Sequence, residues 1–359
     1  MDFEGSTTIA AHDHRSIDDL SPNAAAARAE QARTAREWIN IVAKYREPSA
    51  GRSIFEIAVT AIPFFALWFL AYLASHVSYA LTLLIAVPAA FFLVRLFLIQ
   101  HDCGHGAFFK GKSANDWVGR VLGIFTMTPY AVWKRSHAIH HADSGNLDER
   151  GLGAIDTLTV DEYRALSWAG RLKYRLYRHP ITMFVVGPAW VFIVQQRFPA
   201  GHWKNVRFWL SAMGTNLSFA AVFVGLCYLV GVGPALKVHL PIVALASSIG
   251  VWLFYIQHQF EHTYWEHQMQ WNVHDAAFNG SSHYDLPQPL RWLTANIGIH
   301  HIHHLYARIP FYRLSEVLRD FPDLVNHRRM TLAQSIRCQK LKLWDEKNKA
   351  LVAFNDVKL

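Results

Sequence analysis

Long uninterrupted runs of apolar residues alternate with polar segments along this chain. Four runs reach the length of about 20 apolar residues that a helix needs to cross a bilayer. They predict spans at 54–75, 77–99, 208–232 and 238–257. Buried helices of a large soluble protein keep a polar face, and these runs have almost none. The pattern therefore predicts an all-α integral membrane protein whose four transmembrane helices form two hairpins.

The polar remainder divides the chain and predicts its orientation. We expect an N-terminal segment at 1–52, a membrane domain at 53–320 and a C-terminal tail at 321–359. The stretch 110–178 carries eleven Lys and Arg, whereas the turn inside each hairpin carries at most one. The positive-inside rule then predicts cytoplasmic termini and a cytoplasmic loop between the hairpins, as in a multi-pass protein of a bacterial inner membrane. The shorter apolar run 181–196 is expected to lie in the interface.

Composition narrows the classes of protein further. With 52% apolar and 17% charged residues, the chain is not of the disordered class. Its net charge of +8 lies beside the apolar runs, which suits a membrane surface and not nucleic acid. The three cysteines, Cys103, Cys227 and Cys338, form no CxxC pair, so neither a disulfide framework nor a cysteine zinc site is supported.

Histidine is abundant and clustered. Nine of the 21 histidines fall in the windows 101–105, 137–141 and 300–304, where even scattering would place about one. Residues three or four apart share a face of a helix, so each window can direct several imidazoles at one place. The predicted ligands are His101, His105, His137, His140, His141, His300, His303 and His304. His301 lies about 100° from His300 around a helix and is expected to point away.

Eight imidazoles are too many for one ion and suit a pair of ions, held in a helical cap at the cytoplasmic ends of the spans. Imidazole binds Zn, Cu, Fe and Ni, so the ligand type does not select the metal. His258, at the end of the last span, is either a ninth ligand or a hydrogen-bonded interfacial histidine. Asp102, Asp143 and Glu261 are candidate acceptors for the free ring N–H of the ligands. Soluble di-iron carboxylate proteins use paired Glu-x-x-His motifs, and this chain contains none.

The histidine windows and their flanking segments resemble the membrane fatty acid desaturase family. That family's three histidine boxes are matched by HDCGH (101–105), HAIHH (137–141) and HHIHH (300–304). The flanking sequence resembles most the acyl-lipid, Δ12-like branch of that family. Four segments carry this similarity: SGNLDERGLGAIDTLTV (144–160), QHQFEHTYW (257–265), SSHYDLP (281–287) and TANIGIHHIHHLYARIP (294–310). The resemblance covers roughly residues 50–320. It implies that the eight histidines hold a non-haem di-iron centre, that His258 matches a further histidine of the pattern, and that His262 replaces an expected acidic residue.

The resemblance also implies an activity. An enzyme of this kind uses two iron ions (Fe2+/Fe3+), O2 as co-substrate and two electrons to introduce a cis double bond, here Δ12/omega-6-like, into a lipid acyl chain. No HPGG-type cytochrome segment is apparent, so we expect a separate electron donor, either a ferredoxin or a b-type cytochrome with its reductase. Zinc can replace iron in overexpressed protein, because imidazole binds both. Candidate lining residues of an acyl tunnel are Trp117, Trp133, Trp252, Tyr255 and Trp292.

Two alternative functions fit parts of the pattern. A di-iron lipid hydroxylase or carotenoid ketolase has the same boxes and differs only in whether the substrate radical loses a second hydrogen or recombines with oxygen. A histidine-rich metal transporter is expected to place its ligands near the bilayer midplane, whereas these windows lie at span ends on one side. The acyl carrier (glycerolipid, CoA or ACP) is left open by the sequence.

Overall fold

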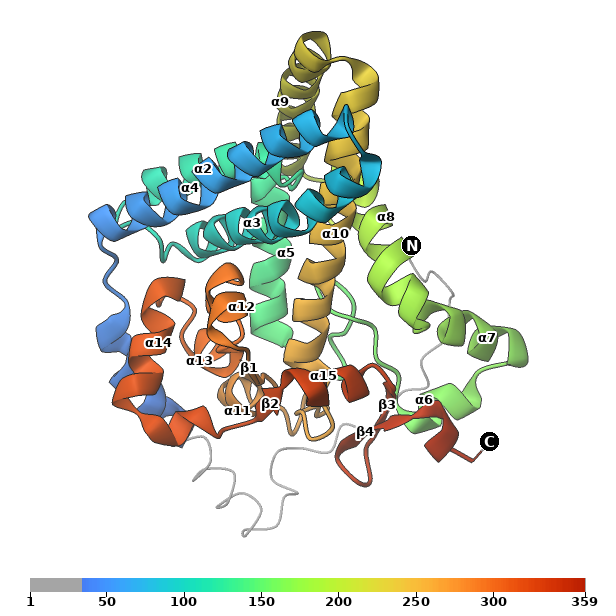
Figure 1. Cartoon of the computed structure of the whole chain (residues 1–359). Helices are drawn as coiled ribbons and strands as arrows, with labels where there is room; N and C mark the ends of the chain where they lie inside the picture. The colour runs from blue at the N-terminus through green and yellow to red at the C-terminus, as the bar shows by residue number, and fades with distance from the viewer. Residues whose placement is uncertain (1–33, 359) are drawn as a thin grey trace.

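The computed structural model of this chain describes residues 34–358, and most of them are helical (Figure 1). Four helices are long and apolar enough to cross a membrane: α2 (Ala50–Ser75), α3 (Tyr79–His105), α9 (Val206–Val230) and α10 (Val232–His258). Helices α2 and α3 pack against each other, as do α9 and α10. The predicted fold class, an all-α membrane protein with two helical hairpins, is confirmed.

The two hairpins differ in how much of them the protein covers. Only 6% of the apolar part of α9 is buried, against 56% of that of α3. Helix α3 contacts α2, α4 (Lys112–Phe125) and α10, whereas the α9–α10 hairpin projects beyond α2 and α3 at the top of Figure 1. Gly231 alone connects α9 to α10 with a φ of 88°, which L side chains rarely adopt. Because this turn is so short, α10 begins at Val232, earlier than the apolar pattern predicts.

Helix α3 carries the first histidine window on the same helix as an apolar span. It continues past Ile99 to His105 and ends at Gly106, whose φ is 69°. The Gly106 N–H donates to the carbonyls of Asp102 and Cys103, and left-handed glycine caps of this kind commonly end a helix. The membrane helix thereby positions His101 and His105 without an intervening loop.

A buried ion pair joins the first two apolar runs. Arg95 and Glu56 are each 1% exposed and form an ion pair with one another. The Arg95 side chain therefore does not extend toward the membrane–water interface. The Arg95 guanidinium also donates to Thr60 at 3.1 Å and to the carbonyl of Trp292. These bonds join α2 and α3 to α12 (Gln288–Leu293), which precedes the third histidine window.

Shorter helices between the two hairpins complete one side of the cap. They are α5 (Tyr130–Asp143), α6 (Val160–Ala165), α7 (Trp168–Tyr177), the π-helical turn η3 (Thr182–Val186), α8 (Gly187–Ile193) and the 3-10 turn η4 (Gln195–Arg197). The predicted run 181–196 changes helix type along its length, because η3 passes directly into α8 and the 3-10 turn η4 follows, and Pro188 at the start of α8 has no N–H to continue a regular ladder. Its depth in the membrane stays a prediction.

The chain after α10 folds over the histidine ends of the long helices (Figure 1). Its helical elements are α11 (Val273–Asn279), α12, α13 (His300–Leu305), α14 (Phe311–Asp320), η5 (Pro322–Val325), α15 (Leu332–Cys338) and η6 (Phe354–Asp356). Strand β1 (His283–Asp285) pairs in parallel with β2 (Arg329–Thr331), and β3 (Leu341–Asp345) pairs antiparallel with β4 (Ala350–Ala353). Trp344 on β3 is 1% exposed and packs against Leu147 and Trp265, which ties the C-terminal residues to the cap.

Candidate metal centre

Nine histidines from four helices converge in two adjacent groups. They come from the ends of α3, α5 and α10 and from α13. The first group is His101, His105, His137, His141 and His303, and the second is His140, His258, His300 and His304. Within each group, one ring nitrogen of every histidine lies within 4.8 Å of those of the others. The structure therefore brings together all eight histidines of the three windows and also His258.

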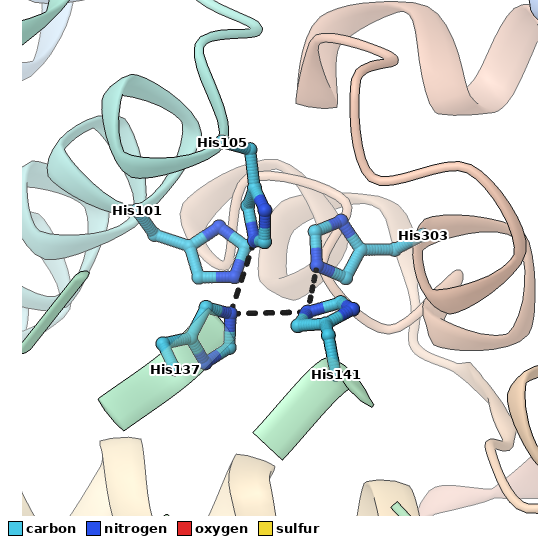
Figure 2. Close-up of side chains that lie close together, drawn as sticks. All are labelled: His101, His105, His137, His141 and His303. Atoms are coloured by element: carbon cyan, nitrogen blue, oxygen red, sulfur yellow. Dashed lines mark hydrogen bonds between the residues drawn. The ribbon is translucent and has the colours of Figure 1, made fainter. Parts of the chain in front are cut away.

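The imidazoles of the five-histidine group face a common centre (Figure 2). The Nε2 atom of His137 is 3.0 Å from Nε2 of His105 and 3.1 Å from Nε2 of His141. His303 closes the group, with its Nε2 at 3.2 Å from that of His141. Two nitrogens bound at right angles to one ion, each about 2.1 Å from it, lie about 3.0 Å apart. The observed spacing fits ligands that share an ion.

The four-histidine group is more deeply buried. Its central member is His258, whose Nε2 lies 3.1 Å from that of His140 and 3.0 Å from that of His300. His304 completes the group, and both of its ring nitrogens are buried without a hydrogen-bond partner among the described residues. A buried polar atom without a partner is costly, and a metal ion would satisfy it. The four-histidine group thus also fits a metal site.

Neighbouring histidines in a window belong to different groups. His140 and His141 are consecutive on α5, and His303 and His304 are consecutive on α13. Consecutive residues project about 100° apart around a helix, so each pair addresses two centres. The two groups meet where the rings of His141 and His304 stack with their centroids 4.0 Å apart.

Burial keeps these imidazoles in the form that binds metals. It lowers the pKa of the six group members on α5 and α13 well below the usual value of histidine, because the cation loses its hydration. Neighbouring imidazoles lower these pKa values further, since two cations would repel each other. Metal ligation requires neutral imidazole, so the chemistry of the donor set suits two ions.

Two groups outside the clusters orient ligands. Nδ1 of His258 is 3.1 Å from the carbonyl of Gly280, to which it donates, and this leaves Nε2 free to bind a metal. Asp102 lies 3.4 Å from Nδ1 of His101 and accepts a 2.7 Å hydrogen bond from the backbone N–H of Phe311. Asp143, by contrast, lines a cleft beside His140, and the side chain of Glu261 is exposed.

The remaining histidines of this region lie elsewhere. His301 is fully buried, and its Nε2 donates to the carbonyl of Leu324 at 3.1 Å. His283 and His327 lie beside it and bond to the carbonyls of Val325 and Phe278 at 2.6 and 2.9 Å. His262 is exposed, His274 is half-buried and His267 is held between two surface carboxylates. These six histidines belong to neither group.

The aromatic residues named as lining candidates have different surroundings. Trp133 stacks on His137 with ring centroids 4.7 Å apart, and Trp292 lies under the Arg95 guanidinium. Trp117 is exposed, and the Tyr255 hydroxyl donates to the carbonyl of Leu341 at 2.9 Å. Among these five, Trp252 lines an apolar cavity.

Two cavities flank the half of α10 that ends at His258. The larger, of about 330 Å³, is lined between α3, α10 and α12 by Phe91, Phe184, Ser248, Ile249, Trp252, Leu253, Tyr284, Leu286, Leu290, Thr294 and Leu332. The smaller, of about 30 Å³, is lined by two metal-site histidines, His140 and His258, with Phe254, Ala154 and Gln259 among its other walls. Trp252 and Phe254 are two residues apart, so they project about 160° apart around the helix, and the cavities lie on different faces.

Some contributors to the site have no signal in the sequence. The Gly280 carbonyl that orients His258 is 22 residues from it along the chain, and the Phe311 N–H is 209 residues from Asp102. Backbone groups carry no residue type that a motif can reveal. Phe254 packs on His140 and His258 with ring centroids 5.0 and 5.5 Å apart, but its position in an apolar run resembles that of any core residue.

Four apolar helices, two of which end at paired clusters of histidines, define a membrane protein built around a candidate metal pair. Comparison with known proteins gives the family. The profile of the fatty acid desaturase family matches residues 75–334, and this chain belongs to that family. It is therefore a membrane-bound desaturase, an oxidoreductase, as the three boxes predict.

Individual relatives agree with this assignment. A fatty acid desaturase of Bacillus subtilis (strain 168) is 46% identical over 318 residues, covering 88% of this chain and 90% of that protein. The sn-1 oleoyl-lipid 12-desaturase of Synechocystis sp. is 27% identical, covering 62% of this chain and 63% of the relative. The sn-1 acyl-lipid omega-3 desaturase (ferredoxin) of the same organism is 29% identical, covering 61% of each chain.

Proposed function

We propose that this desaturase acts on acyl chains of membrane glycerolipids and introduces a cis double bond at the Δ12 (omega-6) position. The single observation that carries the desaturase chemistry is the pair of buried histidine groups at the ends of apolar helices. The relatives named for acyl-lipid and oleoyl-lipid substrates support a glycerolipid carrier over CoA or ACP.

Two iron ions are the metals that we propose for the two groups. Bound there, the iron pair supplies the oxidising chemistry that an unactivated methylene requires, since that group has no acidic proton for a side-chain base. The balanced reaction consumes O2, two electrons and two protons, removes one hydrogen from each of two adjacent methylenes, and releases two waters. His101, His105, His137, His141 and His303 would hold one ion, and His140, His258, His300 and His304 the other.

The protein's own residues provide position and exclusion of water. The Gly280 carbonyl and Asp102 orient ligand imidazoles, and the Arg95–Glu56 ion pair fixes α12 and the window that follows it. Trp133 and Phe254 cover the histidine groups with aromatic rings. Such packing keeps bulk water away from a reactive site, which prevents side reactions.

The apolar cavity between α3, α10 and α12 is the proposed place for part of the acyl chain. Only apolar surface is exposed inside it, so it favours hydrocarbon over any charged headgroup. Its walls include Ser248 and Trp252 from α10 and Thr294 next to α12. Replacing Ser248 by Leu is expected to shorten the longest acyl chain that is accepted, whereas the same replacement at Ala244, which is exposed on the same helix, is not.

Product analysis tests both the reaction and the position of the double bond. Expression in a bacterial host without polyunsaturated lipids should yield a lipid with a C12–C13 cis double bond, located by mass spectrometry of dimethyl disulfide adducts. A double bond at another carbon contradicts the Δ12 proposal but leaves desaturation intact, and a hydroxylated or keto product contradicts desaturation itself. Purified protein should contain two iron ions per chain by elemental analysis, and zinc in their place would indicate replacement during overexpression.

A ferredoxin is the proposed electron donor, as the printed name of one relative suggests for that protein. Reduced ferredoxin with its reductase should support desaturation by the purified enzyme in lipid vesicles. A b-type cytochrome with its reductase is the alternative arm of the same assay. Product formed with the cytochrome alone contradicts the proposal.

Both termini and the metal centre are proposed to face the cytoplasm, with the run 181–196 in the interface. Single cysteines at His179 and Gln195, in a chain without other cysteines, should both react with a reagent only from the cytoplasmic side. Labelling of Gln195 from the opposite side would show that this run spans the membrane. The topology would then have to be redrawn.

A further inference from the structure

The two histidine groups differ in how many ligands they offer. An ion with about six coordination positions would keep one position beyond the five-histidine group and two beyond the four-histidine group. Catalytic metal sites keep an open position for water or substrate, whereas structural sites are closed. The ligand count alone therefore favours the four-histidine group as the place for an additional small ligand.

The surroundings of the five-histidine group point the same way. Trp133 stacks on His137 at an interplanar angle of 16° and lies 5.6 Å from His101 between ring centroids. The indole sits so close to Gly104 that a Cβ on that residue would lie 2.7 Å from it. None of the five histidines lines either of the two cavities beside α10. Trp133 therefore packs against one side of this group, in which His105, His137 and His141 are half-buried.

The four-histidine group instead borders a cleft. His140 and His258 form part of its wall, together with Ala154, Phe254 and Gln259. Its volume of about 30 Å³ is room for about two water-sized molecules, each of which needs about 10–15 Å³. A hydrocarbon chain does not fit in this volume, but a diatomic molecule or a triatomic anion does, and the charged residues of the wall are Asp143, Glu149 and Arg150. The apolar cavity, on another face of α10, is lined by no member of either histidine group.

We infer that the cleft beside His140 and His258 is a binding site for dioxygen-sized ligands, and that such ligands bind the ion of the four-histidine group and not that of the five-histidine group. Small ligand and hydrocarbon then reach the centre from different faces of α10. The inference rests on the proposed iron pair and adds to it a division of roles between the two groups. The residues that define it are Ala154, Phe254 and Gln259 on the cleft and Trp133 over the other group.

Azide, a small anion that binds ferric ions, is the probe for this site. The full chain, purified in detergent and loaded with two 57Fe ions, is oxidised and titrated with azide while its Mössbauer spectrum is recorded. Azide should change the signal of one iron of the pair and leave the other unchanged. Equal changes at both irons, or no azide binding to fully loaded protein, would overturn the inference.

A matched pair of variants assigns the affected iron to the cleft. Ala154→Leu fills the cleft and should weaken azide binding about tenfold or more, as overpacking of a small site does. Ser248→Leu makes a similar enlargement in the apolar cavity and should change azide affinity less than about twofold. The opposite ranking, or equal affinities in both variants, would contradict the assignment.

Iron content and size-exclusion profile separate the possible failures. If unmodified protein binds fewer than two irons per chain, the proposed metal pair fails before the cleft is tested. If Ala154→Leu retains two irons and elutes as the unmodified protein does, its azide affinity reports on the cleft alone. If that variant loses iron, Ala154→Val, a smaller enlargement of the same wall, provides the same measurement, and unchanged azide affinity in it counts against the inference.

Discussion

The histidines of the two metal groups lie beside a second cluster of buried histidines that bind no metal in our assignment. The two sets differ in what their ring nitrogens face. In the metal groups the nitrogens face one another at 3.0–3.2 Å, and those of His304 have no partner among the described residues. In the cluster of His283, His301 and His327 each ring instead donates to a backbone carbonyl. In the metal groups several rings converge on a shared centre, whereas in the second cluster each ring uses one nitrogen to donate to the backbone, and the other nitrogens of His283 and His301 are buried without a partner among the described residues. Burial and residue type alone do not distinguish a ligand from a structural histidine.

The largest expected effect comes from removing a nitrogen that faces only other histidines. His304→Gln should lose at least one iron per chain and reduce desaturation by more than about 100-fold. Loss of a group that only orients a ligand typically costs about 10–100-fold, so loss of a ligand itself should cost more. Elemental analysis and product formation measure the two losses. A variant that keeps two irons and its activity would remove His304 from the ligands and undo the contrast between the clusters.

A smaller effect is expected from the carboxylate that joins the metal groups to the backbone. Asp102→Ala removes the contact with His101 and the acceptor of the Phe311 N–H, and metal affinity should fall about 10–100-fold. Competition with a chelator measures this affinity. Asp102→Asn keeps an acceptor oxygen of the same size and should lose less. If both variants bind metal as tightly as the unmodified protein, Asp102 does not orient the ligand.

The structural cluster should respond in stability and not in metal content. His301→Gln should retain two irons and lower the free energy of unfolding by about 1–3 kcal/mol, the cost of an impaired buried hydrogen bond. His283→Gln is the matched variant and should behave alike, because its ring also donates to a carbonyl in η5. Thermal unfolding in detergent and elemental analysis test both. Loss of iron in His301→Gln with normal folding would make it a ligand.

The smallest effect is expected at a surface histidine that faces carboxylates. His267 lies 2.7 Å from Asp148 and 2.9 Å from Glu346. Partial burial lowers the pKa of His267, but the two carboxylates outweigh burial, so the pKa is raised above the usual value of histidine. Its stabilising charge is then fully present below about pH 6.5, the ordinary value for histidine, and is lost as the pH rises through the raised pKa. His267→Gln should cost less than about 1 kcal/mol in that acidic range and nothing at high pH.

The neighbouring ion pair of Lys349 and Glu266, with a separation of 2.7 Å, provides a control for that measurement. Lys349→Gln should have the same small effect at pH 6 and pH 9, because this ion pair contains no histidine. Apparent melting temperatures at the two pH values compare the variants. A His267→Gln effect that grows with pH would reverse the expected sign and show that the histidine is bound as the neutral form.

The sequence by itself determined the elements that depend on local pattern. Four apolar runs predicted the long helices, because a span exposed to lipid must be apolar on all sides and satisfy its own backbone. The spacings in HDCGH, HAIHH and HHIHH predicted which imidazoles share a helical face, and the prediction that His301 points away from its neighbours agrees with its bond to Leu324. These features follow from helix geometry within one segment.

Tertiary structure decided how the histidines are divided and what surrounds them. His140 and His141 are adjacent in sequence, but they belong to different groups because α3 and α10 approach α5 from different sides and bring His105 to one and His258 to the other. The folding of 341–353 as a hairpin over Leu147 and Trp265 likewise depends on contacts between residues about 80 to 200 positions apart in the sequence. The cleft at His258 exists only where α5, α10 and the loop after α5 meet. A local pattern fixes the direction of a side chain on its own helix, but the partner that it meets depends on how the helices pack.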